Sequence, residues 1–122
     1  VKGSLSDTAK KIFRGTLDFK RGCSGSVGDE GDYAIQLSPK TKNISLPLLL
    51  CTEDDVSGNH ASSAGQLDMN TIYFLMTRGF SLEEARLIVV EALIRPLIDR
   101  LDESVREEVL AEVRRKLDTK EK

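Results

Sequence analysis

The sequence predicts a mixed β and α protein in which the strands come first and the helices follow. Apolar and polar residues alternate from residue 1 to about residue 55, whereas residues 67–117 carry apolar residues at helical spacing. Gly/Ser-rich turns separate the alternating runs, as is typical of short strands. We therefore expect two segregated parts, residues 1–65 with strands and residues 66–122 with helices.

The strands are expected at three alternating runs. Residues 12–19 predict a half-buried strand, with Phe and Leu on its apolar face. A Gly/Ser turn region is expected over residues 22–31, and a second strand over residues 33–37 ends before Pro39. Residues 1–10, which contain Ser, Asp and Lys, are expected to be frayed.

A third apolar row consists of Ile44, Leu46, Leu48 and Leu50. Pro47 on the opposite face favours a sheet edge or a coil corner, because proline cannot donate to a ladder. Cys51 follows this run and is expected to be a buried thiol. Strands of this length with Gly/Ser turns fit a sandwich, a barrel or a β-helix equally well.

Helix signals begin at Asp68, whose carboxylate can accept the free N–H groups of a first turn. The inward stripe of this helix is expected at Ile72, Leu75 and Met76. Gly79 is expected to end the helix with a left-handed C-cap.

Two further helices are expected. Ser81 and Glu84 form a capping box that begins the second helix, and Pro96 should bend it. Ser104 and Glu107 offer another capping box for a third helix that runs to residue 117. The last five residues, DTKEK, are expected to be disordered.

Composition excludes several classes of protein. With 18 basic and 20 acidic residues the net charge is −2, which argues against a nucleic-acid-binding protein. No apolar stretch reaches the roughly 20 residues that span a bilayer. Two cysteines without a signal-peptide pattern are expected to be reduced thiols, so we expect a cytoplasmic location.

Residues that could bind a metal lie around the junction between strands and helices. His60 is the only histidine, and the small residues beside it would leave it accessible in a loop. Alternation would place Cys51, Glu53 and Asp55 on one strand face. Together with His60 they could converge on one ion, and this mixed ligand set suits iron or zinc. Acidic residues that cap the next segment are the alternative.

A second candidate surface lies at the turn between the first two helices. Arg78 and Phe80 flank Gly79, and arginine and aromatic residues are favoured at interface hot spots. Inward packing of Phe80 is the alternative. Among catalytic motifs, the Gly-rich run lacks the Gly-Lys-Ser/Thr ending of a P-loop, and the single histidine excludes a multi-histidine zinc enzyme built from this chain alone.

The order of four motifs resembles the C-terminal part of the SufB/SufD family. These are EDDV at residues 53–56, GNHASSAG at residues 58–65, M-x-RG at residues 76–79 and S-x-EEA at residues 81–85. The resemblance implies that residues 1–65 are the terminal rungs of a parallel β-helix truncated at its N-terminus. It also implies that residues 66–122 are a C-terminal helical domain with a three-helix bundle.

The resemblance also implies a function. Such subunits are non-catalytic scaffolds in iron–sulfur cluster assembly, pair with a SufB/SufD partner through their strands and dock the SufC ATPase through helices, here at Arg78, Gly79 and Phe80. A cluster would be transient, shared with the partner near His60, and not bound by this fragment alone. The stretch GDEGDYAIQ lacks the cysteine of SufB-type chains, so the resemblance implies a SufD-like chain or a SufB/SufD relative of uncertain paralogy.

Alternatives of other classes stay open at this point. A small metal-dependent hydrolase would use His60, Glu53 and Asp55, although the chain offers few ligands for it. A generic protein-interaction module would bury a partner against its helices without any chemistry. An exposed terminal strand would also allow a homodimer.

Overall fold

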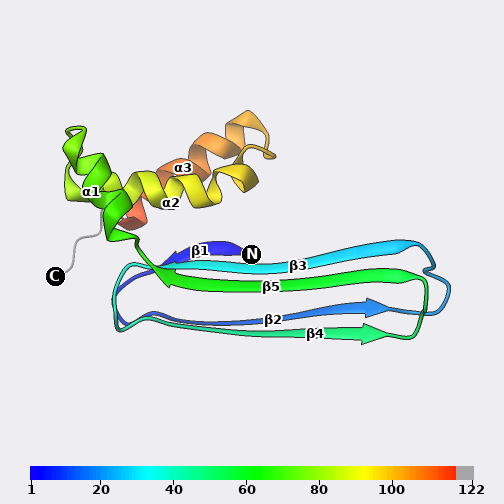
Figure 1. Cartoon of the computed structure of the whole chain (residues 1–122). Helices are drawn as coiled ribbons and strands as arrows, with labels where there is room; N and C mark the ends of the chain where they lie inside the picture. Colours follow the sequence, from blue (N-terminus) through cyan, green and yellow to red (C-terminus); the bar gives the residue numbers. More distant parts are fainter. Residues whose placement is uncertain (118–122) are drawn as a thin grey trace. The chain divides into compact units, whose positions relative to one another are not determined.

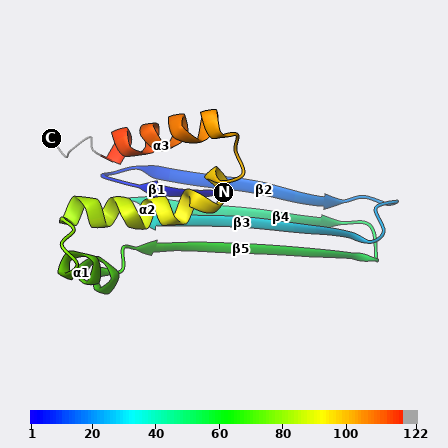
Figure 2. The ribbon, with the colours of Figure 1, turned by 90° about the horizontal axis from the view of Figure 1, so that it is seen from above.

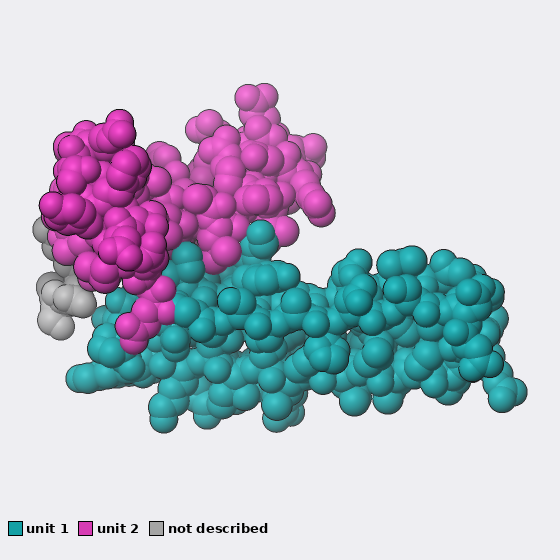
Figure 3. All heavy atoms as spheres, viewed as in Figure 1, with its two compact units in different colours: residues 1–65 teal, residues 66–122 magenta. Residues whose placement is uncertain are grey.

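The structure is a computed structural model that describes residues 1–117. It contains five strands and three helices within that range, and it divides into two compact units, Val1–Gly65 and Gln66–Lys122 (Figure 1, Figure 3). The strands are β1 (Lys2–Leu5), β2 (Lys10–Phe19), β3 (Ser26–Gln36), β4 (Lys42–Cys51) and β5 (Val56–Gln66), and the helices are α1 (Met69–Thr77), α2 (Leu82–Ile98) and α3 (Glu103–Leu117).

The strand unit consists of two parallel sheets, one with the order β1-β3-β5 and the other with β2-β4. Lys2 pairs with Tyr33 and Lys10 pairs with Lys42, so the chain returns to a neighbouring position after 31 (33 − 2) or 32 (42 − 10) residues. Figure 1 shows the two sheets as layers, with the chain running along one and returning along the other. The predicted mixture of β and α elements is thereby confirmed.

The space between the sheets is apolar near one end of the strands. Phe19 is 6 % exposed, and its ring approaches Gly28 of β3 and Gly58 of β5 so closely that a Cβ atom would meet it at 2.9 and 2.8 Å. Leu17 lies against Gly28 as well, and Leu49 against Gly58. The glycines therefore let the two sheets approach each other at this level.

The faces of β3 and β4 differ from the sequence-based expectation, whereas β2 has its Phe and Leu residues on the less exposed face as expected. On β3 the inward residues are Asp32 and Ala34, both buried, whereas Tyr33 is exposed. On β4 the apolar row is exposed, at Ile44, Leu46, Leu48 and Leu50. Alternation establishes that the two faces of a strand differ but not which one lies inward. Here the charged Asp32 can lie inward because it is paired with an opposite charge.

Three segments also differ from the sequence-based expectation in their secondary structure. Residues 2–5 form β1 instead of fraying, and β3 begins at Ser26, inside the predicted turn region. The segment around His60, expected as a loop, is strand β5. Gly, Ser and Ala have low strand propensity, but pairing with a neighbouring parallel strand supplies their backbone hydrogen bonds.

Helix α1 begins as predicted. The Asp68 carboxylate accepts hydrogen bonds from the backbone N–H groups of Asn70 and Thr71, and Ile72 is 1 % exposed. Gly79 follows the helix with φ +95°, as expected of a left-handed C-cap. Met76 was expected on the inward stripe but is exposed, because only a narrow face of this short helix meets α2.

Helices α2 and α3 confirm one capping box and correct the other. Ser81 and Glu84 make both reciprocal hydrogen bonds at the start of α2, which continues through Pro96 to Ile98. Helix α3 begins at Glu103, so Ser104 lies inside its first turn rather than before it. The expected disorder of residues 118–122 lies outside the described residues. Within residues 1–117, the helices lack the combination of length and apolar character that crossing a membrane requires.

Candidate functional site

His60 lies on β5, one of the two edge strands of the three-stranded sheet, and is exposed. Asn59 Nδ2 donates to Asp29 Oδ1 at 3.0 Å, which fixes β5 beside β3 at this point. Because side chains alternate along a strand, His60 shares its sheet face with Gly58, which lies against Phe19. All residues from 59 to 66 are exposed, so the imidazole stands on an open, small-residue edge.

The three other predicted ligands lie around the turn that follows β4. Strand β4 ends at Cys51, so the alternation that would align Cys51 with Glu53 and Asp55 does not continue. Glu53 Oε2 accepts from the backbone N–H of Gly22 at 2.8 Å, and Asp55 Oδ2 accepts from Ser24 Oγ at 2.7 Å. Both carboxylates thus hold the preceding turn, 31 residues earlier in the chain.

Cys51 is exposed rather than buried, because β4 is an edge strand of its sheet. Its thiol donates to the Glu53 carbonyl at 2.9 Å. Over residues 1–117, no three His, Cys, Asp or Glu side chains gather closely enough to hold a metal ion. The structure therefore does not join Cys51, Glu53, Asp55 and His60 into one ligand set, and their ligand roles stay predictions.

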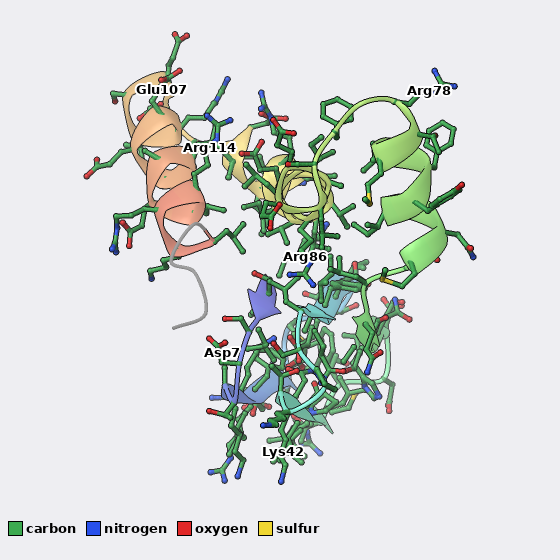
Figure 4. All side chains as sticks on the ribbon, turned by 90° about the vertical axis from the view of Figure 1, so that its left-hand side faces the viewer. Asp7, Lys42, Arg78, Arg86, Glu107 and Arg114 are labelled. Carbon is green, nitrogen blue, oxygen red and sulfur yellow. The ribbon has the colours of Figure 1, made fainter. Side chains whose placement is uncertain are left out.

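The turn between α1 and α2 presents an aromatic surface with one cation. Arg78 caps α1, and its guanidinium carbon lies 4.9 Å from the centroid of the Phe74 ring (Figure 4). Tyr73 is 70 %, Phe74 55 % and Phe80 41 % exposed. We call Tyr73, Phe74, Arg78 and Phe80 the α1 aromatic surface. Partial exposure of Phe80 makes it available to a partner.

Sequence reasoning missed Tyr73 and Phe74. The available signal was their position: they fall between the inward residues Ile72 and Leu75, so the helical period places both on the outer side. Large aromatic residues on an exposed helix face are unusual and typical of interaction surfaces.

A buried ion pair was also missed. Lys11 of β2 forms an ion pair with Asp32 of β3, whose side chain is completely buried, and Asn43 Nδ2 donates to the same carboxylate at 3.4 Å. Burial disfavours the charged form of Asp32, but the hydrogen bonds from Lys11 and Asn43 and the charge of Lys11 outweigh it, so the pKa of Asp32 is lowered. Lys11 and Asp32 lie far apart in the sequence, so no local pattern indicates the pair.

The fold defines a class of protein in which parallel strands pair at intervals of 31 or 32 residues and three helices follow them. The family model "SUF system FeS cluster assembly, SufBD core domain" matches residues 1–93. The chain therefore belongs to the SufB/SufD family.

Individual relatives agree with this assignment. The chain is 33 % identical over 116 residues to the iron–sulfur cluster assembly protein SufD of Bacillus subtilis, covering 94 % of this chain and 26 % of that protein. It is 24 % identical over 117 residues to SufD of Escherichia coli, covering 95 % and 28 %. SufB of Bacillus subtilis is 26 % identical over 102 residues, covering 83 % and 22 %.

Identity to SufD of Bacillus subtilis exceeds identity to SufB of the same organism, so the chain is SufD-like. It spans about a quarter of the length of each of these three relatives.

Proposed function

We propose that this chain is the C-terminal part of a scaffold subunit for iron–sulfur cluster assembly that acts in the cytoplasm without catalysing a reaction itself. The family match over residues 1–93 carries the proposal. In this reading the cluster is cargo that the subunit helps to assemble together with partner subunits.

The strand unit would be the last part of a parallel β-helix whose earlier rungs precede residue 1. Repeats of 31 and 32 residues between paired strands support this reading, because a β-helix advances by one rung per repeat. Side chains such as Glu53, which hold the turn of the previous rung, support it as well. The helical unit would be a three-helix bundle that follows the last rung.

The open edge of β5 would receive a SufB/SufD-like partner by strand pairing, or a second copy of the chain in a homodimer. An exposed strand of 11 residues without Pro, Lys or acidic residues is an unprotected edge. Pairing there would bring a partner's ligands beside His60. By itself, His60 supplies only one imidazole. A transient cluster would then be shared across the interface and not held by this chain alone.

The α1 aromatic surface would dock a SufC-like ATPase. Its aromatic rings around one arginine have the composition of an interface hot spot, and helix α1 itself carries no charged residue. ATP hydrolysis on that partner would move the helices and thereby act on the strand edge near His60.

The role of His60 is tested by cluster maturation in the full-length protein with its partners. We expect His60→Ala to reduce cluster formation to near background, because these 122 residues contain no other imidazole that could replace it at this strand. Ser62→Ala is the matched control, since Ser62 is exposed on the same face of the same strand. Equal cluster yield from His60→Ala and the wild type would remove the His60 role.

The docking surface is tested by capture of a SufC-like ATPase. The double variant Arg78→Glu/Phe80→Ala should lose the ATPase, whereas Arg100→Glu, a charge reversal in the exposed turn after α2, should retain it. Undiminished capture by the double variant would contradict the docking proposal without affecting the His60 experiment.

The alternative of a metal-dependent hydrolase would require a set of ligands around one ion. The described residues, 1–117, offer no group of three such side chains, and Glu53 and Asp55 already accept hydrogen bonds from the neighbouring turn. No observation favours it over the scaffold.

A further inference from the structure

The carboxylate of Glu30 is buried between the two sheets without a partner. Glu30 lies on the inward face of β3, and its side chain reaches across to Gly15 of β2, where an added Cβ atom would collide with the carboxylate. Both carboxylate oxygens are buried, and neither has a hydrogen-bond partner among residues 1–117. Because an unpaired buried carboxylate costs free energy, its presence requires an explanation.

The groups around Glu30 on β2 and β3 do not supply this partner. Lys11 is already bound to Asp32, the next inward residue of β3. Phe13 borders the site from β2, and its ring would meet a Cβ atom on Gly15 at 2.9 Å. Glycine and a phenyl ring have no side-chain donor, so a partner for Glu30 has to come from another strand.

The register of β3 and β5 is fixed at two successive positions. On the outer face Asn59 donates to Asp29, 30 residues earlier in the chain. On the inner face Gly58 and Gly28, again 30 residues apart (58 − 28), both lie against Phe19. The same offset at two neighbouring positions indicates that the two strands stay in this register.

His60 and Glu30 are the next inward pair in this register (60 − 30). Their strands are neighbours in the sheet, and neighbouring strands lie about 4.8 Å apart, so the two side chains are within reach of each other. Because β5 is an edge strand, Glu30 lies on the side of His60 that faces away from the open edge. The imidazole is exposed in the structure, and a rotamer change would turn it toward Glu30.

We propose that Glu30 is a positioning residue for His60. Its carboxylate accepts a hydrogen bond from Nδ1–H of the imidazole, which leaves Nε2 as the free nitrogen toward the open edge of β5. Imidazoles that bind metals commonly donate their second N–H to a carboxylate, which fixes the tautomer and the orientation of the ring. The inference rests on the proposed function, since it adds Glu30 to the site at which His60 would meet a cluster.

The test determines the tautomer of His60 in the full-length protein. Proton–nitrogen correlation spectra of protein with isotope-labelled histidine show which ring nitrogen carries the proton, and the signals of His60 are those lost in His60→Ala. We expect the Nδ1–H tautomer in the wild type. In Glu30→Leu its ratio to the Nε2–H tautomer should fall about tenfold or more, because a hydrogen bond to a charged group is lost. Leucine suits the apolar surroundings of Glu30, so this variant should fold.

Three further variants separate the position of the carboxylate from other effects. Gly15→Ala displaces the carboxylate without removing it, and should also reduce the Nδ1–H tautomer. Glu30→Gln keeps an acceptor oxygen and should retain part of the preference. Asp29→Asn is the matched control, because Asp29 precedes Glu30 but bonds to Asn59 on the outer face, and this variant should keep the wild-type tautomer.

Cluster maturation with the partner subunits gives a second readout. We expect Glu30→Leu to slow cluster formation about tenfold, as is typical when the carboxylate behind a ligating histidine is lost, and Asp29→Asn to leave it unchanged.

Two results would overturn the inference. One is a tautomer of His60 that is the same in Glu30→Leu as in the wild type. The other is cluster formation in Glu30→Leu as fast as in the wild type while His60→Ala forms none, and this result would leave the proposed function intact. Equal cluster yields from His60→Ala and the wild type would instead contradict the proposed function, and a changed tautomer in Glu30→Leu would then still support the hydrogen bond.

Discussion

The strand unit and the helical unit differ in the kinds of residue that they bury. In the helical unit the buried residues are aliphatic or alanine, namely Ile72, Ala85, Val90 and Ile98. In the strand unit a complete ion pair lies between the sheets, while five aliphatic residues stand exposed on one outer face. The views in Figures 1 and 2 show the difference in build, long flat strands against short helices.

This difference shows that the two units are specified by contacts over different distances along the chain. Helix boundaries depend on groups three or four residues apart, as at Ser81 and Glu84. The strand unit depends on contacts about 20 to 31 residues apart, such as Lys11 with Asp32 and Gly22 with Glu53. Variants of the long-range contacts should therefore have the larger effects.

The largest effect is expected from Asp32→Ala, which leaves Lys11 without its partner between the sheets. We expect a loss of about 3 kcal/mol in the free energy of unfolding, measured by chemical denaturation. Asp29→Ala is the control, because Asp29 lies on the outer side of the same strand. Equal losses from both variants would show that burial of the pair does not matter.

Low pH should weaken the contribution of the same ion pair to the free energy of unfolding. Because the pKa of Asp32 is lowered in the folded chain, its carboxylate contributes stability that is present above the unfolded pKa, near 3.8, and is lost as the pH falls through the folded pKa. The free energy of unfolding of the wild type should thus fall more steeply below pH 4 than that of Asp32→Ala. Parallel pH profiles would contradict this assignment.

The next effect concerns the close approach of the two sheets. In Gly58→Ala the new methyl group would meet Phe19 at 2.8 Å and Leu49 at 2.9 Å, so we expect a loss of about 2 kcal/mol. A methyl group added in Gly65→Ala, in the same strand, would have no atom within 4 Å, so this variant should be nearly neutral. Thermal unfolding of the two variants side by side provides the measurement.

A smaller effect is expected at the helix caps. Ser81→Ala removes the capping box of α2 and should cost about 1 kcal/mol in chemical denaturation. Ser104→Ala is the informative control, because Ser104 lies inside α3 and makes no cap there. A loss at Ser104 as large as that at Ser81 would favour the helix start that the sequence predicts.

The smallest effect is expected between α2 and α3. Arg114 Nε donates to Glu91 Oε1 at 2.7 Å, but the arginine side chain is 55 % exposed. Glu91→Gln should change the free energy of unfolding by no more than about 0.5 kcal/mol. A loss comparable to that of Asp32→Ala would erase the difference between the two units.

Much of the helical unit could be predicted from the sequence. Asp68, Gly79 and the Ser81–Glu84 box mark helix ends because capping is local chemistry. Met76 was placed inward wrongly, since a helical period defines a stripe but not its width. The same helical period places Tyr73 and Phe74 on the outer side of α1, where both are exposed.

The candidate site was only partly predictable. His60, Glu53 and Asp55 were recognised by residue type and by their resemblance to a family motif. Their geometry was not, because the strand β5 exists only through pairing with β3, and both carboxylates are held by a turn 31 residues away. The propensities of Gly, Ser and Ala could not indicate a strand there.

Residue types at short spacing were sufficient to predict the order of strands before helices, the caps of α1 and α2, and the motifs that the SufB/SufD family shares. The folded chain was needed to establish which face of each strand lies inward, that Asp32 is buried beside Lys11, and that the row from Ile44 to Leu50 meets solvent. Alternation has two equivalent phases, and the choice between them depends on partners distant in the chain.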